Sequence, residues 1–140
     1  MNRKRRTEVL IRSTSDSAKK LAAVIIGNYE ISTLSEPSHG LVMIKVRETA
    51  QQQLFYLGEV FVTEARVKVA GQIGVGMVVG DQQELAYHLA IIDAAYAASL
   101  PETEQWSTYL LEEEQLISEQ NIAEANRVYR TKVSFETMDV

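Results

Sequence analysis

Residues 61–79, FVTEARVKVAGQIGVGMVV, decide the fold expected for this chain. Apolar or small residues occupy every second position of the first half, which is the period of a β-strand with one covered face. We expect these residues to face the core: Phe61, Thr63, Ala65, Val67 and Val69. The residues between them should face solvent or a partner: Val62, Glu64, Arg66 and Lys68. Ala70-Gly71-Gln72 then predicts a tight turn, so the next strand must run antiparallel.

The returning strand carries a run of glycines that invites a nucleotide-binding interpretation. Gly74, Gly76 and Val78 share one face of it, and the apolar side chains share the other: Ile73, Val75, Met77 and Val79. A dinucleotide fingerprint needs its glycines in the turn between a parallel strand and a helix, whereas these alternate within a strand. No Lys-Ser/Thr pair follows Gly80, which excludes an ATPase-type phosphate loop. We interpret the glycines as flat positions where another element packs closely.

Before this hairpin, the sequence predicts two helices and two further strands. The first helix covers 3–13, and the second begins after Ser15 or Ser17 and ends at Gly27-Asn28. Strands are expected at 29–34 and 41–47, separated by a turn at 35–40 that is rich in Ser, Pro and Gly. Gln51-Gln52-Gln53 is expected at a turn, and Leu54 begins the long third strand.

After the hairpin, the pattern becomes helical. Asp81 can cap a helix over 82–98, with an alanine-rich face beside its larger apolar residues. Ser99-Leu100-Pro101-Glu102 has the form of a capping box for another helix, which continues or restarts through Ile122 and Val128. Residues 133–138 suggest a final short strand or an extended tail. The expected fold is α+β: a single domain over 1–140, with an antiparallel meander of about four strands packed with N-terminal and C-terminal helices.

Composition excludes several classes of function. The chain has 140 residues, a net charge of −5 and no cysteine, so it offers no thiolate and no disulfide. Its one dense basic run, at 3–6, is too short for a nucleic-acid contact face. No apolar stretch approaches the roughly 20 residues of a membrane span, and the basic N-terminus precedes an amphipathic segment, unlike a signal peptide. We expect a cytoplasmic protein.

Few residues suit chemistry. His39 and His88 lack a partner at metal-site spacing, so the sequence predicts no metal site, no cofactor site and no catalytic residue. Asp93 lies in an apolar segment, and a buried carboxylate must be paired or hydrogen-bonded. We expect it to pair with Arg or Lys or to bond another helix; a contact across a subunit interface is the alternative. The spacing of Glu59 and Asp93 does not argue for a general-acid pair.

Four segments resemble one protein family. FYLGEVFVTEA at 55–65 is similar to its segment F-x-L-G-E-V-x-V-T, and Gly74, Gly76 and Gly80 follow at the right distance. AYHLAIIDAA at 86–95 resembles its alanine-rich helix with an aspartate before alanine. KVSFETM at 132–138 resembles its closing V-x-F-x-T-M, which includes Phe135 and Met138. The chain is thereby identified as a member of the PhnG family, a small subunit of the bacterial carbon–phosphorus lyase core complex.

The resemblance implies a role in using phosphonates as a phosphorus source. It implies a complex with PhnH, PhnI and PhnJ. In that complex an alkylphosphonate displaces adenine from ATP, so this is a transferase reaction and ATP is a substrate of the complex. It supplies no catalytic residue for this chain. Two departures stand out: the family often has Asp-Gly where this chain has Ala70-Gly71, and a basic residue where this chain has Asp81. A phosphate contact through that basic residue is therefore in doubt here.

Three roles remain open at this point. The chain is either a structural subunit that packs against larger partners, or a subunit that contributes Glu59, Thr63 or Arg66 to the pocket for ATP or phosphonate. An unrelated small-molecule-binding α+β dimer is the third. An apolar sheet face left uncovered marks a partner site, so the isolated chain is expected to form a homodimer. The residues expected at interfaces or in family motifs are Leu57, Gly58, Glu59, Thr63, Arg66, Gly74, Gly76, Gly80, Asp93, Phe135 and Met138.

Overall fold

The computed structural model describes residues 2–13, 16–47 and 54–138, with side chains described at 2–13, 16–45 and 57–128. Its elements follow one another as α1 (Arg3–Arg12), α2 (Ser17–Asn28), β1 (Ile31–Arg47), β2 (Leu54–Val69), β3 (Gln72–Val79), α3 (Gln83–Ala97) and α4 (Glu102–Met138). The strands form one antiparallel sheet in the order β1-β2-β3. The α+β meander is thus confirmed, with three strands in place of about four.

The missing strand reflects a turn that does not form. Residues 35–40 continue β1 as a single strand, and the pairing with β2 shifts register between Thr33 and Ser35 and again between Ser35 and Ser38. β1 lies at the edge of the sheet, where Pro37 removes no ladder hydrogen bond from a second neighbour. The turn-forming composition therefore produces irregular pairing within one long strand instead of a reversal of the chain.

The glycines of β3 bring α3 close to the sheet. A Cβ at Gly76 would lie 2.0 Å from the carbonyl oxygen of Ala86, and one at Gly74 would lie 2.1 Å from that of Ala90. Distances this short leave no room for a side chain, so backbone packs against backbone. The interpretation of these glycines as flat packing positions is confirmed.

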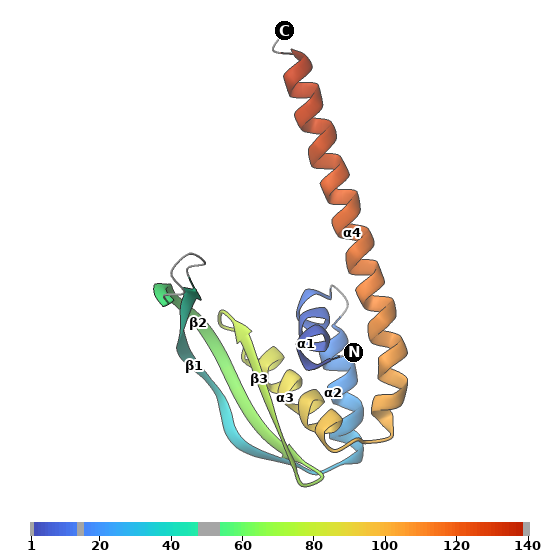
Figure 1. Cartoon of the computed structure of the whole chain (residues 1–140). Coiled ribbons are helices and arrows are strands. Elements are labelled where there is room, and N and C mark those ends of the chain that lie inside the picture. Colours follow the sequence, from blue (N-terminus) through green and yellow to red (C-terminus); the bar gives the residue numbers. More distant parts are fainter. Residues whose placement is uncertain (1, 14–15, 48–53, 139–140) are drawn as a thin grey trace.

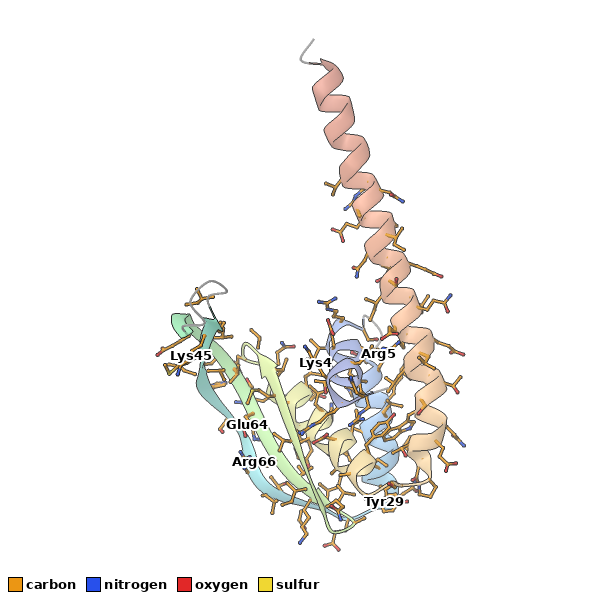
Figure 2. All side chains as sticks on the ribbon, in the orientation of Figure 1. Lys4, Arg5, Tyr29, Lys45, Glu64 and Arg66 are labelled. Carbon is orange, nitrogen blue, oxygen red and sulfur yellow. The ribbon has the colours of Figure 1, made fainter. Side chains whose placement is uncertain are left out.

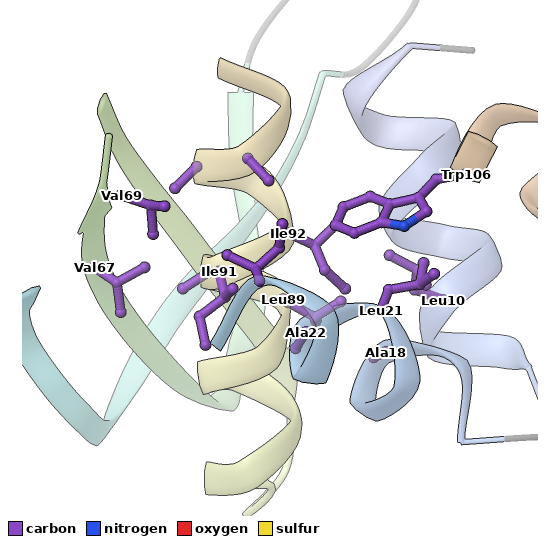
Figure 3. Close-up of a cluster of buried hydrophobic side chains, with 14 of the residues drawn as sticks. Leu10, Ala18, Leu21, Ala22, Val67, Val69, Leu89, Ile91, Ile92 and Trp106 are labelled. Atoms are coloured by element: carbon purple, nitrogen blue, oxygen red, sulfur yellow. The ribbon is translucent and has the colours of Figure 1, made fainter. Parts of the chain in front are cut away.

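The molecule is layered outward from the sheet. α3 covers one face of β2 and β3, α2 packs on α3, and α1 lies between α3 and α4 (Figure 1). Figure 3 shows Val67 and Val69 of β2 on one side of α3, with Leu10 and Trp106 on the other. Because it has neighbours on both sides, α3 is buried around most of its circumference.

The alternation predicted for β2 holds from Thr63 to Val69 and fails at Phe61 and at Val62, which was expected to face solvent or a partner and is buried. Thr63, Ala65, Val67 and Val69 are fully buried, whereas the side chain of Phe61 is 43% exposed. Phe61 is exposed because α3, the helix that covers this face, begins too far along the sheet to reach it. The backbone N–H of Gln82, just before the helix, donates to the Thr63 hydroxyl at 3.2 Å. The helix therefore begins level with Thr63 and does not reach Phe61.

Three local predictions near the helix ends are wrong. Asp81 does not cap α3, because its carboxylate accepts from Nε2 of His39 at 2.7 Å. α4 begins at Glu102 without a capping box, because the Glu102 carboxylate accepts from the Tyr29 hydroxyl at 3.0 Å. Residues 133–138 continue α4 and form neither a strand nor an extended tail. The turn expected at 51–53 lies outside the described residues.

The tight turn after β2 is confirmed, with positive φ at Ala70 (49°) and Gly71 (83°). Two such residues in a row suit the right-handed twist of a hairpin. Within the described part of the chain, no helix combines the length and the apolar character needed to cross a bilayer.

We predict that Gly76→Ala lowers the free energy of unfolding by about 1–3 kcal/mol, the usual cost of overpacking. The added methyl would overlap the Ala86 carbonyl, so α3 would have to move away from β3. The matched control is Gly27→Ala in α2, where a Cβ meets nothing within 4 Å; it should be neutral or stabilising by up to about 1 kcal/mol. Urea unfolding of both variants is the measurement, and equal midpoints would contradict the packing argument.

An ion pair joins α1 to α4 and supplies a second prediction. The Arg5 guanidinium donates to both carboxylate oxygens of Glu114, and this hydrogen bond lowers the pKa of Glu114. A carboxylate with a depressed folded-state pKa stabilises the fold above its ordinary value of about 4.3 and loses that contribution as the pH falls through the lower value. We expect Glu114→Gln to lower Tm at pH 7 and not at pH 3, measured by circular dichroism. An equal decrease in Tm at both pH values would contradict this account.

Candidate functional site

Asp93 of α3 lies at the outer edge of β3 and binds three donors. Its Oδ2 accepts from the backbone N–H of Val75 at 2.9 Å and from Arg3 at 2.9 Å, and Arg6 lies 3.5 Å from Oδ1. The Asp93 side chain is only 16% exposed. A strand edge presents backbone groups without a ladder partner, and here the carboxylate satisfies one of them. The predicted pairing with arginine is confirmed.

The cations around Asp93 belong to α1. The Arg6 guanidinium lies 3.8 Å from the centroid of the Tyr96 ring, so it contacts the ring and the carboxylate together. Burial lowers the pKa of Arg6 and raises that of Tyr96. The arrangement ties α1 to the β3 edge and to α3 in one contact, which is a structural role.

Thr63 and Gly80 join the end of β3 to the start of α3. The Thr63 hydroxyl donates to the carbonyl oxygen of Gly80 at 2.6 Å and accepts from the N–H of Gln82 at 3.2 Å. Gly80 has a φ of 89°, which favours glycine. The buried hydroxyl is therefore satisfied within the fold.

The three residues considered for a substrate pocket do not converge. Thr63 is buried on the face of β2 that α3 covers. Arg66, three residues on, lies on the opposite face, where Nε donates to Glu64 at 2.9 Å. Figure 2 shows Glu64 and Arg66 side by side on the sheet. Glu59 is exposed opposite Met43 of β1.

The two histidines occupy separate places. His39 binds Asp81 and lies against the ring of Phe61, with centroids 4.8 Å apart. His88 borders a cleft of about 550 Å³ beside the N-terminal ends of α2 and α3, and burial lowers its pKa. Among the residues described, no cluster of three or more His, Cys, Asp or Glu side chains could hold a metal ion.

The far end of the β1–β2 hairpin is the most exposed apolar part of the sheet. We call it the hairpin arm: residues 41–47 of β1 and 54–61 of β2, which pair with each other beyond the end of β3 (Figure 1). Leu57 and Gly58 lie in it, at a register shift between Ile44 and Lys45. Its exposed large apolar side chains are Leu41, Val42, Met43, Ile44, Leu57 and Phe61.

Sequence reasoning missed the significance of this arm, although a signal was present. Residues 41–44, LVMI, are an unbroken apolar run, and such runs are typical of strands covered on both faces. The other candidates lie elsewhere: Gly74 and Gly76 are buried against α3, and Phe135 and Met138 belong to α4 with side chains outside the described part.

We predict that Asp93→Asn lowers the free energy of unfolding by about 2–4 kcal/mol, because two arginines lose their carboxylate in a largely buried contact. The control is Asp81→Asn, which alters an exposed pair with His39 and should change stability by less than about 1 kcal/mol. Chemical denaturation measures both. An Asp93→Asn variant of wild-type stability that failed to assemble with partners would instead assign Asp93 to a subunit interface.

Comparison with known families agrees with the resemblance read from the sequence. The sequence model of the family described as "Phosphonate metabolism protein PhnG" matches residues 1–139, nearly the whole chain. A search of curated proteins found no match. The matched range includes every element from α1 to α4, and with it the hairpin arm, the glycines of β3 and Asp93. The chain therefore belongs to the PhnG family of phosphonate metabolism proteins.

Proposed function

We propose that this chain is a non-catalytic, accessory subunit of the carbon–phosphorus lyase complex. It supports the transfer of the ribose triphosphate of ATP to an alkylphosphonate with release of adenine, the activity of a ribose 1-methylphosphonate 5-triphosphate synthase. Its proposed partners are PhnH, PhnI and PhnJ. Membership of the PhnG family supports the phosphonate part of this proposal.

The observation that carries the subunit role is the hairpin arm. Apolar patches larger than a few hundred Å² are rare on monomeric proteins and mark sites of interaction. The arm gathers six large exposed apolar side chains at one end of the sheet. A subunit that works by binding its partners accounts for this surface directly.

The contacts of the candidate residues support a scaffold over a direct role in chemistry. Thr63 and Asp93 are hydrogen-bonded within the fold, and Arg66 pairs with Glu64. In this proposal ATP is a substrate of the complex, and the chain binds no cofactor alone. Since ATP is a cytoplasmic metabolite, the proposal places the chain in the cytoplasm. Alone, the chain is proposed to form a homodimer that covers part of its apolar surface.

Co-expression with the other core subunits tests the proposal. A tag on this chain should recover a stoichiometric complex that releases adenine from ATP and methylphosphonate, and omission of this chain should abolish that release. Size-exclusion chromatography and an adenine assay give the two readouts. If the chain elutes alone and the others are active without it, the proposal fails and a separate small-molecule-binding function takes its place.

Charge reversal separates scaffold from pocket within the same complex. We expect Arg66→Glu to change the rate of adenine release by less than about fivefold, because its ion pair with Glu64 is exposed and such pairs contribute only about 0–1 kcal/mol. Glu59→Lys lies in the hairpin arm, and we expect it to weaken the complex without lowering the activity of the complex that does form. Lys68→Glu is the matched control, two residues along the same face of β2. An intact complex with lost activity for Arg66→Glu alone would favour the pocket.

A further inference from the structure

The hairpin arm lacks the neighbours that cover the rest of the sheet. β3 pairs with β2 only from Val62 onward, and α3 begins level with Thr63. In the part of the chain that the structure describes, the arm therefore extends past the end of β3 and the start of α3, with both faces and both long edges uncovered (Figure 1). Figure 2 shows Lys45 in the arm, well apart from Lys4 and Arg5 of α1.

Both faces of the arm carry exposed apolar side chains, and the exposed Glu59 lies on the same face as Phe61, two residues along β2. Residues directly opposite in an antiparallel pair share a face, so Leu41 and Phe61 lie on the face that α3 covers further along the sheet. Val42 and Val60 lie on the other face, as Ile44 does two residues on. Leu41 is 64% exposed and Ile44 is 39% exposed, so neither face is covered by the chain itself.

A two-stranded hairpin of this kind is poorly stable in water by itself. Exposed apolar side chains gain about 25 cal/mol for each Å² that a partner removes from water. The unpaired backbone groups along its edges also need hydrogen-bond partners once water is excluded. The arm therefore suits a cleft that has apolar walls on two sides and polar groups or a strand at its margin.

Two arms packed face to face in a closed dimer do not provide that cleft. A two-fold axis that pairs the same face of each arm covers that face and leaves the other exposed. One face measures only about 25 Å by 10 Å, from the length and spacing of its strands. That is about a third of the roughly 800 Å² that each partner buries in a stable interface.

We propose that the hairpin arm inserts into an apolar cleft of a different subunit, which covers both of its faces. This inference rests on the proposed function as a subunit and adds the place and manner of attachment. The partner is defined by chemistry: two facing walls that are mainly apolar, separated by the thickness of a single sheet layer, with a polar or cationic group opposite Glu59. Insertion also stabilises the arm, so binding and ordering of the hairpin are coupled.

Two substitutions, one on each face, test the insertion in the co-expressed complex. Leu41→Glu and Val42→Glu should each weaken recovery of the complex at least about tenfold, because each places a carboxylate against an apolar wall. Ile73→Glu is the matched control: Ile73 is 56% exposed on β3, away from the arm, and its substitution should leave the complex intact. The melting temperature of each isolated variant shows that the fold is retained.

Hydrogen exchange gives a second readout that needs no substitution. Amides at 41–45 and 57–61 should exchange at least about tenfold more slowly in the complex than in the isolated chain, while amides at 63–69 change little. The inference is overturned if the complex stays intact with either Leu41→Glu or Val42→Glu, since loss of the complex on one face only does not fit insertion. It is also overturned if the arm amides are as well protected from exchange in the isolated homodimer as in the complex. Failure of the unaltered chain to form any complex would overturn the proposed function as well, so the two failures are distinguishable.

Discussion

The close packing of β3 on α3 is the contact on which the rest of the structure depends. Without side chains at Gly74 and Gly76, the backbones of strand and helix meet directly. This approach brings Asp93 of α3 to the outer edge of β3, where it binds the Val75 amide and two arginines of α1. α1 then holds α4 through Arg5 and Glu114. Each layer is thus placed by the one beneath it, from the sheet outward.

The same packing decides which surface is left for partners. α3 begins beside Thr63, where the hydroxyl joins Gly80 to the start of the helix, so the sheet beyond that point has no cover from the chain. Of the residues considered for chemistry, Thr63 and Asp93 hold these layers together, whereas Glu59 and Arg66 are exposed on the sheet. In a PhnG family protein, this division between a tightly packed body and an uncovered hairpin arm suits assembly with larger subunits.

Some features of the candidate site could be read from the sequence. The glycine spacing of β3 predicted a close approach, which is confirmed. The apolar setting of Asp93 predicted a pairing with Arg or Lys or a bond to another helix, and the structure shows two arginines of α1. The burial of Phe61 was predicted wrongly, because strand periodicity does not reveal where a covering helix begins. The turn expected at 35–40 was also wrong, because composition does not reveal that irregular pairing with β2 keeps the chain in one strand.

The sequence by itself determined the fold class, the antiparallel hairpin, the helical segments before and after the strands, and the family. Those properties follow from short-range periodicity, turn chemistry and motif spacing. Only the tertiary structure decided that the Thr63 hydroxyl bonds the segment that begins α3, that Asp93 binds the β3 edge, and that the arm is bare on both faces. These depend on distant segments meeting in space, and a local pattern contains no information on which segment arrives or where it stops.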